Sequence, residues 1–175
     1  MPRSLRHTLA LLRQELREIV VYANDMSEGT GAPTLTYKGN SPVWQMDDDA
    51  ISDIYGDVKI PIDRVPGTPI DVKIVFATGS GGGHGHVLFN LPYSIAGYGE
   101  SLAGANLTPS TLESAAAANL SKTSSPLRIH ESRMDGRRSS VDIGFRVQRE
   151  GAHVLDTHNH NIFFVKAIFE YTAYV

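Results

Sequence analysis

Residues 57–76 read DVKIPIDRVPGTPIDVKIVF, and this segment predicts two β-strands joined by a turn. Val58, Ile60 and Ile62 alternate with other residues, so they point to one side of an extended chain. The same period of two returns in a second apolar set, Ile70, Val72, Ile74 and Phe76. Between the two sets, a proline followed by a glycine favours a turn.

The same alternation appears twice more along the chain. The two further sets are Val87, Phe89, Leu91 and Tyr93, and then Val141, Ile143, Phe145 and Val147. Residues 162–175 are apolar at both odd and even positions near their start, which favours a strand in the centre of a sheet. With turn signals such as Glu150-Gly151 between the runs, the sequence predicts a mainly β protein. We expect a jelly-roll-like antiparallel β-sandwich of about eight strands.

The N-terminus predicts an amphipathic helix instead. Ser4 is a suitable N-cap, and apolar residues follow at spacings of three and four. This stripe consists of Leu5, Leu9, Leu12, Leu16 and Ile19. Such a short helix is marginal alone in water, so it must dock, either on its own domain or on a neighbouring subunit. In the second case the stripe is the candidate interface.

Residues 24–33 are rich in Asn, Asp, Ser, Gly and Pro, which is typical of a linker. The predicted organisation is therefore a helix and linker arm over residues 1–33 and a β-sandwich domain over residues 34–175. Within the domain, a second short helix is expected over residues 112–120, capped by Thr111, because four consecutive alanines favour helix.

Composition excludes several classes of protein. The chain has 175 residues, enough for one domain, and a formal net charge of -3. A general nucleic-acid binder would carry a basic excess, so no specific nucleic acid is expected as a partner. There is no cysteine, which excludes disulfides, thiolate metal sites and cysteine nucleophiles. No apolar run reaches the roughly 20 residues of a membrane helix, and no secretory signal is apparent, so synthesis in the cytoplasm is expected.

Two histidine strings are the main candidate metal ligands. His84 and His86 are two residues apart, as are His158 and His160, so the members of each pair share one side of an extended chain. The cupins, which are also jelly rolls, use such a pair with a following Glu, but Asn90 and Leu91 stand where that Glu would fall. The sequence therefore predicts no metal and no cofactor. If a metal did bind, these four histidines would be its ligands.

Other chemical motifs are missing or weak. The glycine-rich residues 79–85 lack the Lys-Ser/Thr ending of a phosphate-binding loop, and there is no Gly-x-Ser-x-Gly elbow. The acidic residues 47–49 fit a calcium loop poorly. Trp44, the single tryptophan, is interpreted as a core anchor, with a sugar-stacking platform as the alternative. No catalytic residue is predicted, and the protein is not expected to be an enzyme.

Three groups of residues resemble the structural jelly rolls of phages and other viruses. The first is Trp44 followed by an Asp-rich turn, and the second is the segment 59–74 with its IPID and PGT strings. The third is Val147-Gln148-Arg149, an acidic-Gly turn, Asp156-Thr157 and a C-terminal strand bearing Phe169 and Tyr171. The resemblance covers most of residues 42–175 and implies no catalytic residues.

This resemblance implies a virion structural protein. The expected role is a capsid or capsid-decoration (cement) subunit, with a tail component less favoured, whose partners are copies of itself and other virion proteins. A carbohydrate- or ligand-binding sandwich is the alternative function. The sequence leaves open the position in the virion, the symmetry and the host.

Overall fold

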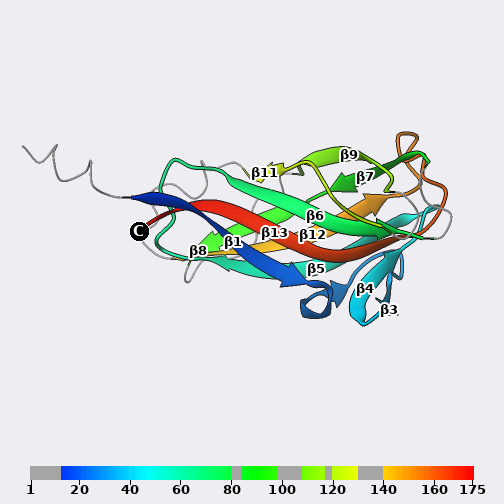
Figure 1. Ribbon diagram of the computed structural model, residues 1–175, viewed down its shortest axis with the longest axis horizontal. Helices are drawn as coiled ribbons and strands as arrows, with labels where there is room; N and C mark the ends of the chain where they lie inside the picture. Colours follow the sequence, from blue (N-terminus) through cyan, green and yellow to red (C-terminus); the bar gives the residue numbers. More distant parts are fainter. Residues whose placement is uncertain (1–12, 80–83, 98–107, 117–119, 130–139) are drawn as a thin grey trace, which may run out of the picture.

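Two antiparallel β-sheets pack face to face in the computed structural model of the chain (Figure 1). The structure describes residues 13–79, 84–97, 108–116, 120–129 and 140–175. Thirteen strands lie in these residues, and every pairing between them is antiparallel. The prediction of a mainly β, antiparallel sandwich is confirmed, but the predicted number of about eight strands is too low, because short strands such as β2 and β10 carry no alternating apolar pattern.

Sheet A has seven strands built around the long C-terminal strand β13 (Ile162–Tyr174). One side of β13 pairs with β6 (Ile70–Thr78), and the other pairs with β4 (Ser41–Met46) and then β1 (Gln14–Tyr22). The sheet is completed by three short strands: β3 (Thr34–Lys38) beside β4, and β10 (Ser121–Thr123) and β11 (Leu127–Ile129) beside β6.

Sheet B has six strands built around β12 (Val141–Glu150). One side of β12 pairs along its whole length with β5 (Ile51–Ile60), and the other pairs with β7 (His86–Asn90) and β8 (Tyr93–Gly97). Two strands close the edges, β2 (Ser27–Glu28) beside β5 and β9 (Ser110–Ser114) beside β7.

The predicted alternating sets form the core between the sheets. Phe76 of β6 meets Phe89 of β7 edge-to-face with ring centroids 5.0 Å apart, and Phe145 of β12 meets Phe169 of β13 at 4.9 Å. These edge-to-face contacts join the two sheets. Ile62 is the exception, because β5 ends at Ile60 before Pro61 and leaves the Ile62 side chain 68% exposed in the turn.

A β-bulge explains why β13 is apolar at both odd and even positions. Its register with β6 shifts between Phe164 and Lys166. Before the shift, the even-numbered Ile162 and Phe164 are buried in the core. After the shift, the odd-numbered Ala167 and Phe169 are buried there. The extra residue of a bulge reverses the inward parity of a strand, so each parity faces the core in one half of β13. Its predicted place inside a sheet is confirmed.

The helix prediction is wrong for residues 14–22, which form β1. Leu16 lies opposite Thr172 and Ile19 lies opposite Phe169 on β13. Leu5, Leu9 and Leu12, the rest of the predicted stripe, lie outside the described residues. The pairing partner, which is distant in sequence, overrides the local helical pattern.

The predicted linker segment is also paired. It contains a 3-10 turn (Ala23–Asp25) and β2, whose Ser27 lies opposite Tyr55 of β5. Residues 14–33 therefore join both sheets, while the domain boundary at residue 33 stays a prediction. The second helix prediction is wrong for residues 112–114, because Thr111 to Ser114 belong to β9.

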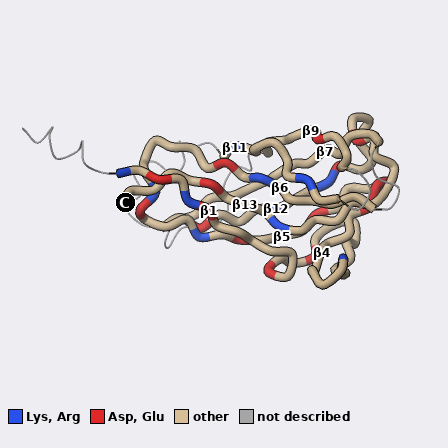
Figure 2. Tube along the Cα trace, in the orientation of Figure 1, with Lys and Arg blue, Asp and Glu red and all other residues tan. Residues whose placement is uncertain are grey.

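Charges of both signs are interspersed along the strands (Figure 2). On sheet A, Arg128 forms two hydrogen bonds with Asp71, and this contact holds the pKa of the Asp71 carboxyl below its usual value. Lys73 pairs with Glu170 at 2.5 Å on the same sheet. None of the helices in the described ranges is long and apolar enough to cross a membrane.

Candidate functional site

The hairpin of β3 and β4 forms one edge of sheet A. A two-residue turn, Gly39-Asn40, joins Lys38 to Ser41, and Gly39 has a φ of +62°. A positive φ at the first turn position is readily adopted by glycine and matches the twist of a tight hairpin. The turn therefore sets the register of β3 against β4, and with it the face of the sheet on which each β3 side chain lies.

On its core-facing side, this hairpin carries exposed apolar residues. Leu35 and Tyr37 lie opposite Trp44 and Pro42 of β4, and their side chains are 45% and 70% exposed. Trp44 is in the core, so Leu35 continues the core-facing side of sheet A beyond the cover of sheet B. The sequence does not reveal this surface, because strand order, which makes β3 the last strand of the described sheet, is not encoded in any local pattern.

Leu35 and Tyr37 also turn backbone groups away from β4. Residues that flank a two-residue turn form a hydrogen-bonded pair, and the bonding then alternates along an antiparallel ladder. Leu35 and Tyr37 therefore occupy the non-bonded positions toward β4 and turn their N–H and C=O groups outward. In the described part of sheet A, β3 is the last strand. We call Leu35, Tyr37 and this unpaired backbone the edge surface.

The described residues of the N-terminal stripe do not share a face. Leu16 lies on the outer face of sheet A and is 66% exposed, whereas Ile19 packs against the core. Along a strand, residues three apart point to opposite faces, so the helical spacing that aligned them no longer applies. Leu16 alone of these two is available as an interface residue.

Trp44 is a core anchor. Its side chain is buried, and its indole N–H donates a 2.7 Å hydrogen bond to the Ala23 carbonyl. This bond ties the 3-10 turn after β1 to β4. The ring is therefore not accessible as a platform for stacking a sugar.

The two histidine strings meet through hydrogen bonds that each involve at least one main-chain atom. The His86 carbonyl accepts hydrogen bonds from the N–H groups of Thr157 and His158, and His158 Nδ1 lies 2.8 Å from the His84 carbonyl oxygen. His158 is buried, with its ring 5.7 Å from that of His160. Across the described ranges, no three or more His, Cys, Asp or Glu side chains form a group that could hold a metal. The metal prediction itself stays a prediction.

The strongest polar feature of this region is a buried ion pair. Arg149 of β12 binds both carboxylate oxygens of Asp156, at 3.1 and 3.0 Å, and both side chains are fully buried. The remaining Arg149 donors bond the main-chain oxygens of Met46, His158 and His160. Paired and hydrogen-bonded in this way, the charges hold the loop after β12 against β4. In the sequence, Arg149 and Asp156 stand out only as parts of the Val147-Gln148-Arg149 and Asp156-Thr157 strings. No local pattern reveals that the two side chains form an ion pair.

Acidic residues after Trp44 form hydrogen bonds within the fold. Asp53 is buried, accepts a 2.6 Å hydrogen bond from the Thr30 N–H, and lies 3.4 Å from Arg146. Asp47 donates its N–H to the Ser52 hydroxyl at 3.2 Å. These contacts hold the turn into β5.

No family model matches the chain, and no curated protein matches it either. Among solved structures, it is similar to the insecticidal delta-endotoxin Cry8Ea1 of Bacillus thuringiensis (8% identity, TM-score 0.44), with 86% of this chain and 24% of the toxin covered. It is also similar to TmCBM61 in complex with β-1,4-galactotriose (9%, 0.32), with 87% and 86% covered. A third similar structure is that of infectious bursal disease virus, Gx strain (12%, 0.36), with 91% and 32% covered.

The chain thus spans about a quarter of the endotoxin and about a third of the viral protein. At these identities and TM-scores, none of the three supports an argument about function.

Proposed function

We propose that this protein is a virion structural subunit, a jelly-roll-type capsid or capsid-decoration protein that acts by assembly and not by catalysis. Its partners are copies of itself and other virion structural proteins, and it is made in the host cytoplasm and ends in the virion. The observation that carries the proposal is the edge surface, where apolar side chains and free backbone groups stand together.

The energetics of the edge surface favour its coverage. An unpaired edge strand presents donors and acceptors that another chain can use, and proteins usually protect such edges. Burying a leucine side chain contributes about 1.5–3 kcal/mol. In a symmetric shell each subunit repeats the same contact, so modest interfaces add up to a stable particle.

The residues that carry the viral resemblance support the same proposal. Arg149 and Asp156 form the buried ion pair, and Phe169 forms a core contact with Phe145. The motif residues thus build the frame of the sandwich and leave its edges for contacts with partners. A structural subunit requires a rigid core and exposed edges for contacts, because its role is to keep its shape within an assembly.

The test is the association of the full chain. Analytical ultracentrifugation over a range of concentrations should show discrete oligomers or large particles. The variant Leu35→Lys with Tyr37→Lys should shift the distribution toward monomer while its β-type circular dichroism is retained, because charged side chains oppose burial at an edge. The matched control is Val154→Lys, since Val154 is 83% exposed in the loop after β12.

Two results would contradict the proposal. The first is a wild-type chain that is monomeric at every concentration and also fails to bind particles of the other shell proteins. The second is a double variant that associates like the wild type, which would remove the edge surface as the carrying observation.

A further inference from the structure

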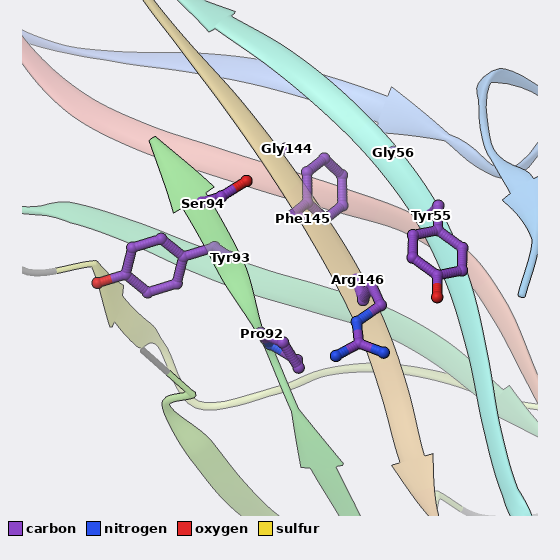
Figure 3. Close-up of a pocket in the computed structure, with 8 residues that line it drawn as sticks. All are labelled: Tyr55, Gly56, Pro92, Tyr93, Ser94, Gly144, Phe145 and Arg146. Carbon is purple, nitrogen blue, oxygen red and sulfur yellow. The ribbon is translucent and has the colours of Figure 1, made fainter. Parts of the chain in front are cut away.

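A shallow depression of about 310 Å³ lies on the face of sheet B where β5, β8 and β12 run side by side (Figure 3). Gly144 of β12 lies opposite Ser94 of β8, and Arg146 lies opposite Tyr55 of β5. Since Gly144 has no side chain, the main chain forms part of the floor. A Cβ atom at this position would lie 3.2 Å from Ser94 Oγ, so the missing side chain helps to create the space.

A cationic group is held in place at one side of this depression. The Arg146 guanidinium carbon lies 5.6 Å from the centre of the Tyr55 ring, and Nη1 lies 3.4 Å from Asp53 Oδ2. Asp53 is buried and is itself fixed by the Thr30 N–H. A guanidinium has five N–H donors, so one long contact with Asp53 leaves donors for a ligand.

The other side chains of the lining are neutral, and the nearest strand neighbour with a charge is the exposed Asp57, which lies opposite Gly144 on β5. Ser94 and Tyr55 contribute hydroxyl groups, and Pro92 contributes an apolar ring. Among the described residues, the side chains that line the depression include no Asp or Glu. The site therefore combines one oriented cation, hydroxyl groups that both donate and accept hydrogen bonds, and an apolar wall.

We propose that this depression binds one acidic pyranose ring, such as a hexuronic acid unit of a polysaccharide. The planar guanidinium matches a carboxylate, which it binds through two parallel hydrogen bonds. Ser94 and Tyr55 suit the ring hydroxyls, and Pro92 suits the apolar face of the sugar. The volume is at the lower end of small-molecule sites and fits a single ring. The site is distinct from the edge surface, so its binding does not depend on assembly.

The test uses the full chain and three probes: methyl β-D-glucuronide, methyl β-D-glucoside and acetate. Titrations followed by amide NMR shifts should show saturable binding of the glucuronide, at least tenfold tighter than that of the neutral glucoside. Acetate alone should bind at least tenfold more weakly than the glucuronide. The variants Arg146→Met, which removes the cation, and Gly144→Ala, which fills the floor, should each weaken glucuronide binding at least tenfold.

Matched controls separate these effects from changes in folding or total charge. Arg128→Met removes an arginine on sheet A. Gly79→Ala adds a methyl group that, among the described residues, meets Phe163 and Asn161 atoms at ordinary distances. Both should bind the glucuronide like the wild type. The proposal is overturned if the glucuronide does not bind, if the glucoside or acetate binds equally well, or if Arg146→Met and Gly144→Ala leave binding unchanged.

Discussion

Removing the carboxylate of the buried ion pair should destabilise the fold strongly. In Asp156→Ala, Arg149 keeps its main-chain partners but loses the carboxylate that it contacts, and its charge stays fully buried. Breaking one side of a buried pair costs about 3–5 kcal/mol, because the remaining charge is uncompensated. For a chain of this length, 1 kcal/mol corresponds to roughly 2–4 °C. The melting temperature should therefore fall by roughly 6–20 °C.

The matched control is Asp71→Ala on sheet A. Asp71 also receives two hydrogen bonds from one arginine, but Arg128 is largely exposed. An exposed pair contributes only about 0.2–1 kcal/mol, so this variant should melt within a few degrees of the wild type. Replacing both buried partners, Arg149→Met with Asp156→Leu, should recover much of the loss, because no buried charge is left unpaired.

Thermal unfolding followed by circular dichroism measures the melting temperatures of all three variants. The reasoning is refuted if Asp156→Ala costs no more than Asp71→Ala. It is also refuted if the double replacement is less stable than Asp156→Ala, because the loss would then come from packing and not from an unpaired charge.

Three further predictions concern other contacts. Burial opposes ionisation of Glu113, but hydrogen bonds from Thr111 and Ser125 and the charge of Lys122 outweigh it, so the pKa of Glu113 is lowered. The ionised Glu113 carboxylate therefore stabilises the fold fully above the ordinary carboxyl pKa, and this stabilisation is lost as the pH falls through the lowered pKa of Glu113. Melting temperatures of Glu113→Gln between neutral and acidic pH should depend less on acid than those of the wild type. Gly85→Ala should lower the free energy of unfolding, measured in urea, by at least about 1–3 kcal/mol. The reason is that φ at Gly85 is +86° and that a Cβ atom would lie 2.5 Å from a main-chain oxygen. A variant as stable as the wild type would refute this prediction. Trp44→Phe should cost about 1–3 kcal/mol because the Ala23 carbonyl loses its 2.7 Å partner, and an unchanged urea midpoint would show that water replaces the indole.

The alternating sets show what local pattern can predict. Ile70 to Phe76 and Val141 to Val147 both lie in strands and face the core, because a period of two dictates the side of an extended chain whatever its neighbours are. Their spacing was therefore sufficient to predict two buried sheet faces.

The N-terminal segment shows where the pattern is ambiguous. The spacing of Leu12, Leu16 and Ile19 fits a helix, yet Gln14–Tyr22 pairs with Tyr174 to Lys166 of β13 along its whole length. A short helix gains little from its own hydrogen bonds, whereas a strand beside β13 gains a full ladder and a place for Val21 in the core. The competing partner lies about 150 residues away in sequence, where no local window includes it.

The sequence by itself determined the class of the fold and the core residues of the four alternating sets, because these depend on side-chain periodicity. Only the tertiary structure decided which strands are neighbours. That choice left β3 as an edge, paired Arg149 with Asp156, brought the two histidine strings together, and set Tyr55, Ser94 and Arg146 around Gly144. The physical reason is that each candidate site combines residues from different strands, and strand order is set by the packing of the whole chain.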